Sequence, residues 1–313
     1  MNNTWVKTLK NLVNHYMTDI THKPVLLKQT IDALNIKPNG VYLDCTLGSG
    51  GHTIQILNKG GKVYGLDIDP KAIKRTKERV KKACLDGRLV CPDAFFKTTK
   101  ANFSKLEQVA QQFDISKVDG ILMDLGLSSE QLEDQSRGFS FQSHDSLDMR
   151  ADPELTVTAK DLVSALSKKE LVKLLSTYGE ESWAPKIAEA IIKARQKKPI
   201  TTAIELSTII SQVVKHDGKT HKATKTFQAL RMAVNDELNN LKTALPQAVK
   251  LLKTDGRLAI ISFHSLEDKI VKDFIKNNSD LTSLTKKPIT PDETEILTNP
   301  RSRSAKLRIA IKK

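Results

Sequence analysis

Short apolar runs alternate with segments of helical periodicity along much of the chain. The runs predict strands at residues 41–46, 63–68, 88–92, 119–125 and 257–263. Most of the segments between these runs carry apolar residues at helical spacing. Strands that alternate with helices are typical of a parallel sheet covered by helices on both faces. We therefore expect an α/β fold with a Rossmann-like sheet.

The alternation stops after the fourth predicted strand. The next segment has helical character and little strand signal, with helices expected at 159–175, 185–196 and 204–214. A long helix at roughly 227–252 then resumes the α/β pattern. Helices between two strands of one sheet indicate a lobe that grows from a loop. Such a lobe could recognise the substrate. Alternatively, it could be a helical cap with no role in recognition.

Three regions follow from this pattern. We expect an N-terminal extension at 1–20, an α/β domain at 21–135 and 226–313, and an inserted all-helical domain at 136–225. The tail at 299–310 is basic and then alternates, which predicts a basic loop followed by a last edge strand.

A glycine-rich turn follows the first predicted strand. The strand ends at Asp44, the turn contains Gly-x-Gly-Gly at 48–51, and the next strand ends at Asp67. A strand, a glycine-rich turn, a helix and an acid at the next strand tip form the ligand edge of nucleotide-binding βαβ units. The glycines would let a ligand approach the backbone, and the acid can accept both ribose hydroxyls of an adenosyl group. By itself, the turn could also be an ordinary tight turn.

The residues around the turn favour one type of adenosyl ligand. A dinucleotide site usually has a third glycine at the helix start, where the pyrophosphate binds, and this chain has Thr53 there. Asp44 would repel a pyrophosphate but suit a cation. S-adenosyl-L-methionine carries an ammonium and a sulfonium group and no phosphate. Two acids at neighbouring strand tips therefore favour a methyl donor over a dinucleotide.

The composition adds a polyanionic partner to this picture. The 313 residues include 50 Lys and Arg against 36 Asp and Glu, a formal net charge of +14. A basic excess provides non-specific affinity for phosphates and favours a polyanionic partner, although a soluble protein with lysine-rich helices is the alternative. Basic stretches at 193–198 and 215–222 lie in the expected insertion, although charge runs are also common on solvated helices.

Cysteine usage and the N-terminus predict the compartment. Cys45, Cys84 and Cys91 are odd in number and form no Cys-x-x-Cys pair, which favours a reducing cytoplasm without disulfides or a structural zinc. No His, Cys and carboxylate cluster has metal-ligand spacing. The N-terminus lacks an apolar signal core, and no apolar run approaches membrane-spanning length. We expect a soluble cytoplasmic protein with no membrane partner and no metal.

The fourth predicted strand delivers Asp124 and Ser128 to the ligand edge. Methyl transfer to an exocyclic amine requires the nitrogen lone pair, which is conjugated with the ring, to be turned toward the methyl group. A hydrogen-bond acceptor against the N–H does this and disperses developing charge. Asp124 is the first candidate for this catalytic role and Ser128 the second, although Asp124 could instead cap the following turn. Methylation of a pyrimidine carbon would need a cysteine nucleophile, and this loop has none.

Eight ordered motifs carry a family resemblance. They lie at 22–27, 44–52, 119–129, 137–141, 147–150, 226–231, 261–268 and 299–304. Together they resemble the MraW family, the ribosomal RNA small subunit methyltransferases H, from about residue 22 to the end. The resemblance implies a bacterial cytoplasmic enzyme that methylates N4 of a cytidine in the decoding region (P site) of 16S rRNA with S-adenosyl-L-methionine. The expected partner is 16S rRNA within the small ribosomal subunit, and the oligomeric state stays open.

The resemblance also implies the residues that contact the cofactor. They are Gly50, Gly51, His52, Asp67, Phe95, Asp124 and Gln131. Phe95 is chosen because the family has a contacting phenylalanine after the third strand, and Phe96 is the alternative. The stretch around Pro92 departs from the usual His-Gly-Asn-Phe pattern of the family. Either ring could instead belong to the core.

A second set of residues is expected to contact RNA. It comprises Arg137, Phe139, Asp148, Arg150, Arg231, His264, Arg301 and Arg303. Arginines pair with phosphates, and an aromatic ring can stack on an unstacked base. Plainer alternatives exist: Arg231 could form a salt bridge with Asp236, and His264 could cap a helix that begins near Ser265.

Two other function classes compete with an RNA methyltransferase. One is a small-molecule methyltransferase, which the basic insertion and arginine-rich tail disfavour. The other is a non-catalytic ribosome-binding factor that keeps the cofactor fold, which the intact glycine turn and both acids disfavour.

Overall fold

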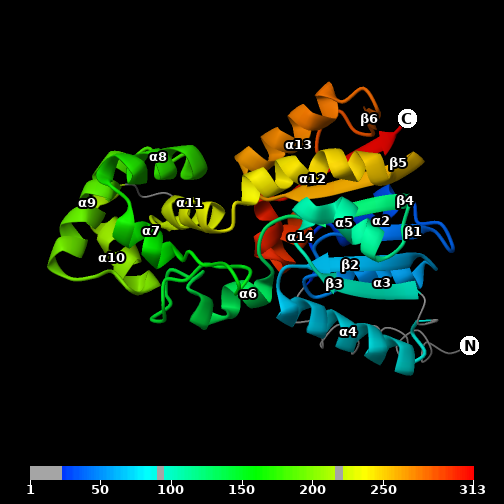
Figure 1. Cartoon of the computed structure of the whole chain (residues 1–313), viewed down its shortest axis with the longest axis horizontal. Helices are drawn as coiled ribbons and strands as arrows, with labels where there is room; N and C mark the ends of the chain where they lie inside the picture. The colour runs from blue at the N-terminus through cyan, green and yellow to red at the C-terminus, as the bar shows by residue number, and fades with distance from the viewer. Residues whose placement is uncertain (1–22, 90–94, 216–220) are drawn as a thin grey trace, which may run out of the picture.

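Seven strands form one sheet in the part of the chain that the computed structural model describes, residues 23–89, 95–215 and 221–313. They are β1 (Val41–Asp44), β2 (Lys62–Asp67), β3 (Phe96–Lys100), β4 (Val118–Asp124), β5 (Leu252–Ser262), β6 (Leu281–Ser283) and β7 (Lys306–Lys312). Their order is β3-β2-β1-β4-β5-β7-β6, parallel from β3 to β5 and antiparallel at β7 (Figure 1). The strand order reverses between β1 and β4, where doubly wound sheets bind ligands. The predicted α/β, Rossmann-like fold is confirmed, and the expected extension at 1–20 lies outside the described residues.

The third strand is not where the sequence predicted it. Arg88 and Leu89 lie in a bend, residues 90–94 lie outside the described residues, and the strand occupies Phe96–Lys100. β3 is the edge of the sheet and pairs only with β2 among the described strands. Its sequence, Phe-Lys-Thr-Thr-Lys, is largely polar because an edge strand is only partly covered. It therefore lacks the apolar run by which the other parallel strands were recognised.

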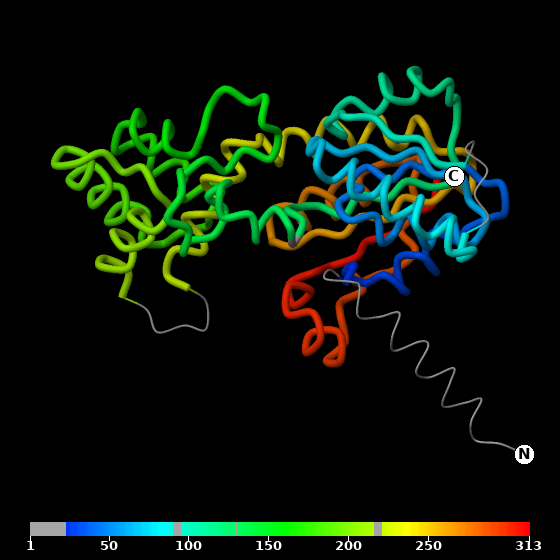
Figure 2. Tube along the Cα trace, turned by 90° about the horizontal axis from the view of Figure 1, so that it is seen from below, coloured from blue at the N-terminus to red at the C-terminus, as the bar shows by residue number. Residues whose placement is uncertain are grey.

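The tail forms a strand, as predicted, but not at the edge. β7 is antiparallel to β5, and β6 pairs with its other side. Before β7 come α14 (Glu293–Thr298) and a 3₁₀ turn at Pro300–Ser304. Glu295 Oε1 accepts the Leu26 backbone N–H at 2.6 Å. Figure 2 shows this red segment against the blue start of the described chain, so these two segments lie side by side.

Helices cover both faces of the sheet. One face carries α2 (Leu27–Leu34), α3 (Gly51–Asn58) and α4 (Pro70–Leu85), and the other carries α5 (Leu106–Gln112), α12 (Glu237–Leu251) and α13 (Ser265–Asn277). Alternate residues of a strand supply the two cores, because side chains point to opposite faces. In β4, Ile121 and Met123 pack toward α12, whereas Leu122 packs with the α2 and α3 side.

A separate group of helices lies beside the sheet. After β4 the chain forms α6 (Ser129–Glu133), a 3₁₀ turn (Gln135–Arg137), α7 (Ala159–Ala165), α8 (Lys168–Gly179), α9 (Ala184–Lys197), α10 (Ala203–Val213) and α11 (Thr224–Val234). Helices α7 to α11 share their own hydrophobic core, and we call them the helical lobe. Figures 1 and 2 show this lobe standing to one side of the sheet. Helix α11 packs within it, whereas the boundary expected at residue 225 assigned α11 to the α/β domain.

Two helices expected to be continuous are each split. The helix expected at 159–175 breaks before Ser167, whose side chain forms a capping box with Glu170 at the start of α8. The helix expected at 227–252 breaks at Asp236, which adopts a left-handed conformation with φ 48°. The Asn235 side chain stabilises this break by accepting from Ala151 N (2.7 Å) and donating to the Met149 carbonyl (2.8 Å).

Cysteine chemistry differs in one respect from the expectation. Cys45 is a buried free thiol, whereas Cys84 is disulfide-bonded, so the expected absence of disulfides is wrong for Cys84. Cys91 lies outside the described residues. None of the helices in the described ranges is long and apolar enough to cross a membrane.

Candidate active site

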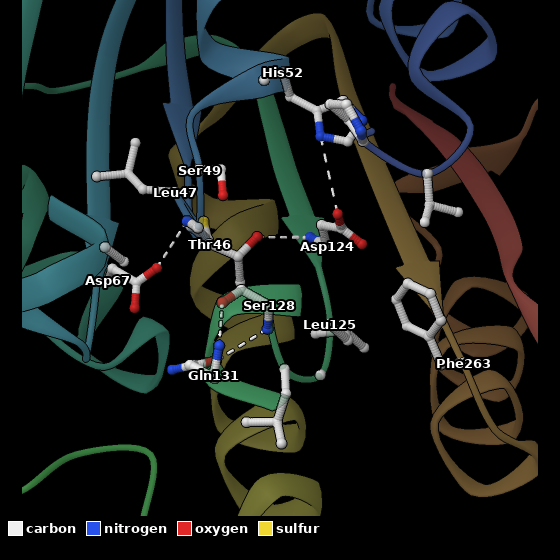
Figure 3. Close-up of a pocket in the computed structure, with 18 of the residues that line it drawn as sticks. Thr46, Leu47, Ser49, His52, Asp67, Asp124, Leu125, Ser128, Gln131 and Phe263 are labelled. Atoms are coloured by element: carbon white, nitrogen blue, oxygen red, sulfur yellow. Dashed lines mark hydrogen bonds and ion pairs between the residues drawn. The ribbon is translucent and has the colours of Figure 1, made fainter. Parts of the chain in front are cut away.

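A pocket opens at the carboxyl ends of the central strands. It has an empty volume of about 1030 Å³, part of it open to solvent. The turn after β1, the ends of β2 and β4, and Phe263 after β5 line it (Figure 3). Ser128 and Gln131 of the α6 region and the tail residues Asn299 and Arg301 complete it. We call it the strand-end pocket, and it lies where the fold predicts a ligand.

Gly50 and Gly51 allow other parts of the protein to pack closely against the turn. A Cβ on Gly50 would come within 2.6 Å of Thr76 Cγ2 on α4, and a Cβ on Gly51 within 2.1 Å of Pro24 Cγ. Gly50 also has φ +75°, which disfavours any other residue. The protein therefore needs both glycines for its own packing, and their expected contact with the cofactor stays a prediction. They allow the turn to pack between α4 and the segment before α2, and Gly51 and His52 line the pocket.

Asp67 occupies the tip of β2 and lines the pocket. Its carboxylate accepts the backbone N–H groups of Gly48 and Asp69, each at 2.9 Å, which fixes its orientation. Burial raises the pKa of Asp67 to about 6, and the neighbouring Asp69 and Asp44 carboxylates act in the same direction. Asp67 is therefore a firmly positioned acceptor that ionises close to neutral pH.

Asp44 lies under the turn instead of facing the pocket. Its side chain is buried and accepts from Thr53 Oγ1 at 2.6 Å and from Thr46 N at 3.2 Å. Burial raises the pKa of Asp44. Its negative field still reaches the site, because it contributes to the raised pKa values of Asp67 and Asp124.

Asp124 ends β4 and faces the pocket beside His52 (Figure 3). Its Oδ2 lies 3.9 Å from His52 Nδ1, and its Oδ1 is buried without a hydrogen-bond partner among the described residues. Burial raises the pKa of Asp124 well above its usual range, and the Asp44 and Glu267 carboxylates add to the shift. The alternative role as a turn cap has no support here, because no hydrogen bond joins this carboxylate to the turn within the described ranges. A buried acceptor without a donor suits a ligand that brings an N–H.

Ser128 and Gln131 form a capping box at the start of α6. Ser128 Oγ accepts from Gln131 N at 3.2 Å, and Gln131 Oε1 accepts from Ser128 N at 2.9 Å. Gln131 also donates to Asp69 Oδ2 at 3.2 Å. Both side chains line the pocket, but their hydrogen bonds to each other's backbone show that they cap the start of α6.

The aromatic residue after the third strand is Phe103, not Phe95. Phe95 precedes β3 at the end of the sheet opposite the pocket, where its ring packs with Lys62. Phe103 follows the carboxyl end of β3 and lines the pocket near Asp67. Phe95 was chosen because the third strand was predicted too early in the sequence. The Asn102-Phe103 pair matches the end of the His-Gly-Asn-Phe pattern and could have identified Phe103 instead.

Most of the residues expected to contact RNA are engaged inside the protein. Arg137 Nη1 lies 2.7 Å from the buried Asp69, and its Nη2 donates to the carbonyls of Arg150 (2.8 Å) and Ala151 (2.5 Å). Phe139 is buried in the core of the helical lobe. The Arg150 guanidinium donates to both oxygens of Asp148, each at 2.7 Å. These residues shape the link between the sheet and the helical lobe.

Two of the remaining four candidates are also engaged inside the protein, and the other two are exposed. Arg231 forms a salt bridge with Glu237 at 2.8 Å and not with Asp236, the partner that the sequence suggested. His264 caps α13, as its plainer alternative proposed. Arg301 lines the pocket and has a 3.4 Å contact with the exposed Glu133, and Arg303 is exposed. Among these eight described residues, only the two tail arginines are exposed, and of these two Arg301 lines the pocket.

One cluster has the spacing of metal ligands. Glu237, His264 and Glu267 each offer an atom within 4.8 Å of the others, so the expectation that no such cluster exists is wrong. Both Glu237 oxygens, however, lie 2.8 Å from Arg231. His264 Nδ1 accepts from Glu267 N at 3.3 Å, so in the neutral ring Nε2 carries the proton and has no lone pair for a metal. This geometry favours an ion-pair network.

Comparisons with known proteins show the family of this chain. The family model described as the MraW methylase family matches residues 19–313. Ribosomal RNA small subunit methyltransferase H of Halothermothrix orenii is 44% identical over 315 residues, 93% of this chain and 98% of that protein. The same-named protein of Caldicellulosiruptor saccharolyticus is 45% identical over 93% of this chain and 99% of its own length. A solved putative rRNA-methylase from Clostridium thermocellum is similar with a TM-score of 0.47 and 13% identity, covering 93% of this chain and 100% of that one. By its family match and its relatives, this chain belongs to the MraW methylase family.

Proposed function

We propose that this protein transfers a methyl group from S-adenosyl-L-methionine to the exocyclic N4 of a cytidine in the decoding region of 16S rRNA. The observation that carries the proposal is Asp124, an acceptor at a strand tip that lacks a donor among the described residues. The printed name of the relatives and the net charge of +14 support a ribosomal RNA substrate, encountered within the small subunit in the bacterial cytoplasm.

The acids of the pocket suit the proposed cofactor. Asp67 would accept the ribose hydroxyls through its remaining lone pairs, and Phe103 would supply apolar surface to the adenine. Burial raises the pKa of both Asp44 and Asp124, and a bound ammonium or sulfonium would favour their ionised forms, whereas a pyrophosphate would be repelled by them. The cofactor would supply a methyl group that is open to nucleophilic attack.

Direct attack by nitrogen is the mechanism we propose. Asp124 would accept the amine N–H, turn the nitrogen lone pair toward the methyl carbon and disperse the charge that develops. Most of the rate enhancement would come from positioning, which can contribute on the order of 7–11 kcal/mol. Cys45 lines the pocket, but burial, together with Asp44, raises the pKa of its thiol well above the usual value. A thiol that resists ionisation is a poor nucleophile, which disfavours attack through a covalent base adduct.

The affinity for S-adenosyl-L-methionine should fall at acidic pH. The proposed ribose contact needs the Asp67 carboxylate, whose pKa is about 6 in the free protein. Binding should therefore be full above this pH and weaken as pH falls through it, by at most about tenfold per unit. Titration calorimetry between pH 5 and 8 measures this. An Asp67→Asn variant should bind weakly at every pH, and an unchanged pH profile in that variant would assign the transition to another group.

The proposed substrate is tested by analysing the RNA itself. Mass analysis of 16S rRNA from cells that lack the gene should show one cytidine without its N4 methyl group. Incubating the purified protein with that RNA, naked or assembled into small subunits, should restore the mark. If the RNA of the deletion strain is fully methylated, the protein is a binding factor or acts on another substrate.

A further inference from the structure

The ring of Phe263 is part of the strand-end pocket and has no role in the function proposed above. Phe263 follows the last residue of β5, and its ring faces the pocket across from Asp124 and Leu125 (Figure 3). Its backbone N–H donates to Glu267 Oε2 at 2.8 Å, which ties this strand tip to the start of α13. Phe263 packs against the core on the α2 and α3 side, but it is only partly buried and lines the pocket, so part of its surface is open to a ligand.

We propose that Phe263 is the surface on which the target base stacks, with the edge of the base facing Asp124. This inference rests on the proposed function and names the residue that positions the acceptor.

The strand order separates a cofactor side from an acceptor side. Asp67 ends β2, Asp124 ends β4, and Phe263 follows β5, with β1 between β2 and β4. Neighbouring strands lie about 4.8 Å apart, so Phe263 is about 14 Å across the sheet from Asp67 but only one strand from Asp124. A cofactor anchored by its ribose at Asp67 would extend toward β4. The pocket beside β5 is then left for the group that receives the methyl.

The space beside the ring is kept open by a glycine. Gly126 has φ +90°, and a Cβ built on it would lie 3.7 Å from Phe263 Cδ2. Any longer side chain there would project over or against the ring. Leu125 and Gly126 both line the pocket, so the backbone after β4 passes close to Phe263 without covering it.

Polar groups from the tail lie at the same pocket. Asn299 and Arg301 line it, and Asn299 Nδ2 donates to the Lys23 carbonyl at 3.0 Å, which holds the tail against the segment that contains Pro24. An aromatic face for a base and a guanidinium for a phosphate are the groups that recognise a single unstacked nucleotide.

Asp124 adds a preference among bases in this arrangement. An exocyclic amine lies in the plane of its ring, so a base stacked on Phe263 would direct its N–H groups sideways to a carboxylate at the neighbouring strand tip. Cytosine offers such an N–H, whereas uracil offers a carbonyl oxygen at the same position. Facing the ionised form of Asp124, which a neighbouring sulfonium would favour, that oxygen would meet an acceptor with no proton between them, and this disfavours uracil.

The test compares two phenylalanines that line the pocket on opposite sides. We expect Phe263→Leu to lower kcat/KM for RNA by roughly 5- to 150-fold, the value of one aromatic–base stack, with little change in affinity for S-adenosyl-L-methionine. Phe263→Tyr should keep most of the activity because it keeps the ring. Phe103→Leu, the matched control, should weaken cofactor affinity first. Cofactor affinity is measured by calorimetry, and thermal unfolding confirms that each variant is folded.

Three results separate the possible failures. If Phe263→Leu keeps wild-type kcat/KM, the ring is only part of the core and the inference is wrong. If it loses cofactor affinity as strongly as turnover, Phe263 belongs to the cofactor site and the inference is also wrong. If the wild-type protein binds S-adenosyl-L-methionine but methylates no cytidine in rRNA, the proposed function fails, and with it the inference, whatever the variants do.

Discussion

Replacing Asp124 with alanine is expected to lower turnover by about 10²- to 10³-fold, the usual cost of removing one preorganised polar group from a reacting centre. The variant should stay folded. Burial, with the Asp44 and Glu267 carboxylates nearby, raises the pKa of Asp124 well above its usual range, so the native fold does not stabilise this charge. Its removal should leave the unfolding temperature unchanged or higher. Single-turnover transfer at saturating S-adenosyl-L-methionine, together with differential scanning calorimetry, measures both effects.

Asp124→Asn is the matched control for this experiment. The amide keeps the shape and one acceptor oxygen but not the negative charge, so its turnover should lie between wild type and Asp124→Ala. A large loss in both variants would assign the main role to the charge. Turnover close to wild type in Asp124→Ala would remove Asp124 from the mechanism.

Replacing Arg137 with alanine is expected to reduce the free energy of unfolding by about 3–5 kcal/mol, because it leaves a buried carboxylate without its partner. Arg137 joins Asp69, two residues after the proposed ribose acceptor, to the carbonyls of Arg150 and Ala151 at the entrance to the helical lobe. Ala151 also lines the pocket, so the variant should lose cofactor affinity as well. Arg137→Lys keeps the charge but cannot reach three oxygens at once, and it should rescue little stability. Urea unfolding monitored by circular dichroism tests this.

The same experiment distinguishes a structural role for Arg137 from the RNA contact that the sequence suggested. An arginine that only binds a phosphate would leave stability unchanged and lower the salt dependence of RNA binding by about one unit. We expect that behaviour from Arg303→Ala, because Arg303 is exposed on the tail. If Arg137→Ala behaves like Arg303→Ala, the buried pair with Asp69 is dispensable and the sequence-based role is the right one.

The sequence predicted the central strands well for a physical reason. β1, β2, β4 and the second half of β5 are largely buried and therefore contain apolar runs. β3 lies at the edge and is largely polar, so the same rule missed it. The split between α11 and α12 depends on Asp236 and on hydrogen bonds from Asn235 to residues about 85 positions away. Local periodicity carries no information about such contacts.

The site was predictable where strand tips define it. Asp67 and Asp124 were found because an acid that ends a parallel strand must lie at the ligand edge. The same rule applies to Phe263, at the end of the predicted fifth strand, and would have found it. Phe95 was wrong because its strand was misplaced. The orientation of an arginine is a different problem, because only the fold determines whether the guanidinium turns inward, as in Arg137, or outward.

A single amide ties together the chain that leaves the sheet and the chain that returns to it. Asn235 accepts from Ala151 N and donates to the carbonyls of Met149 and Arg231. An Asn235→Asp variant would replace its donor nitrogen with an oxygen that faces two carbonyl oxygens. That variant should therefore first lose the fixed orientation of the α7–α11 helices, while the seven strands persist. Its protease sensitivity near residues 149–151 should rise without any change in sheet content.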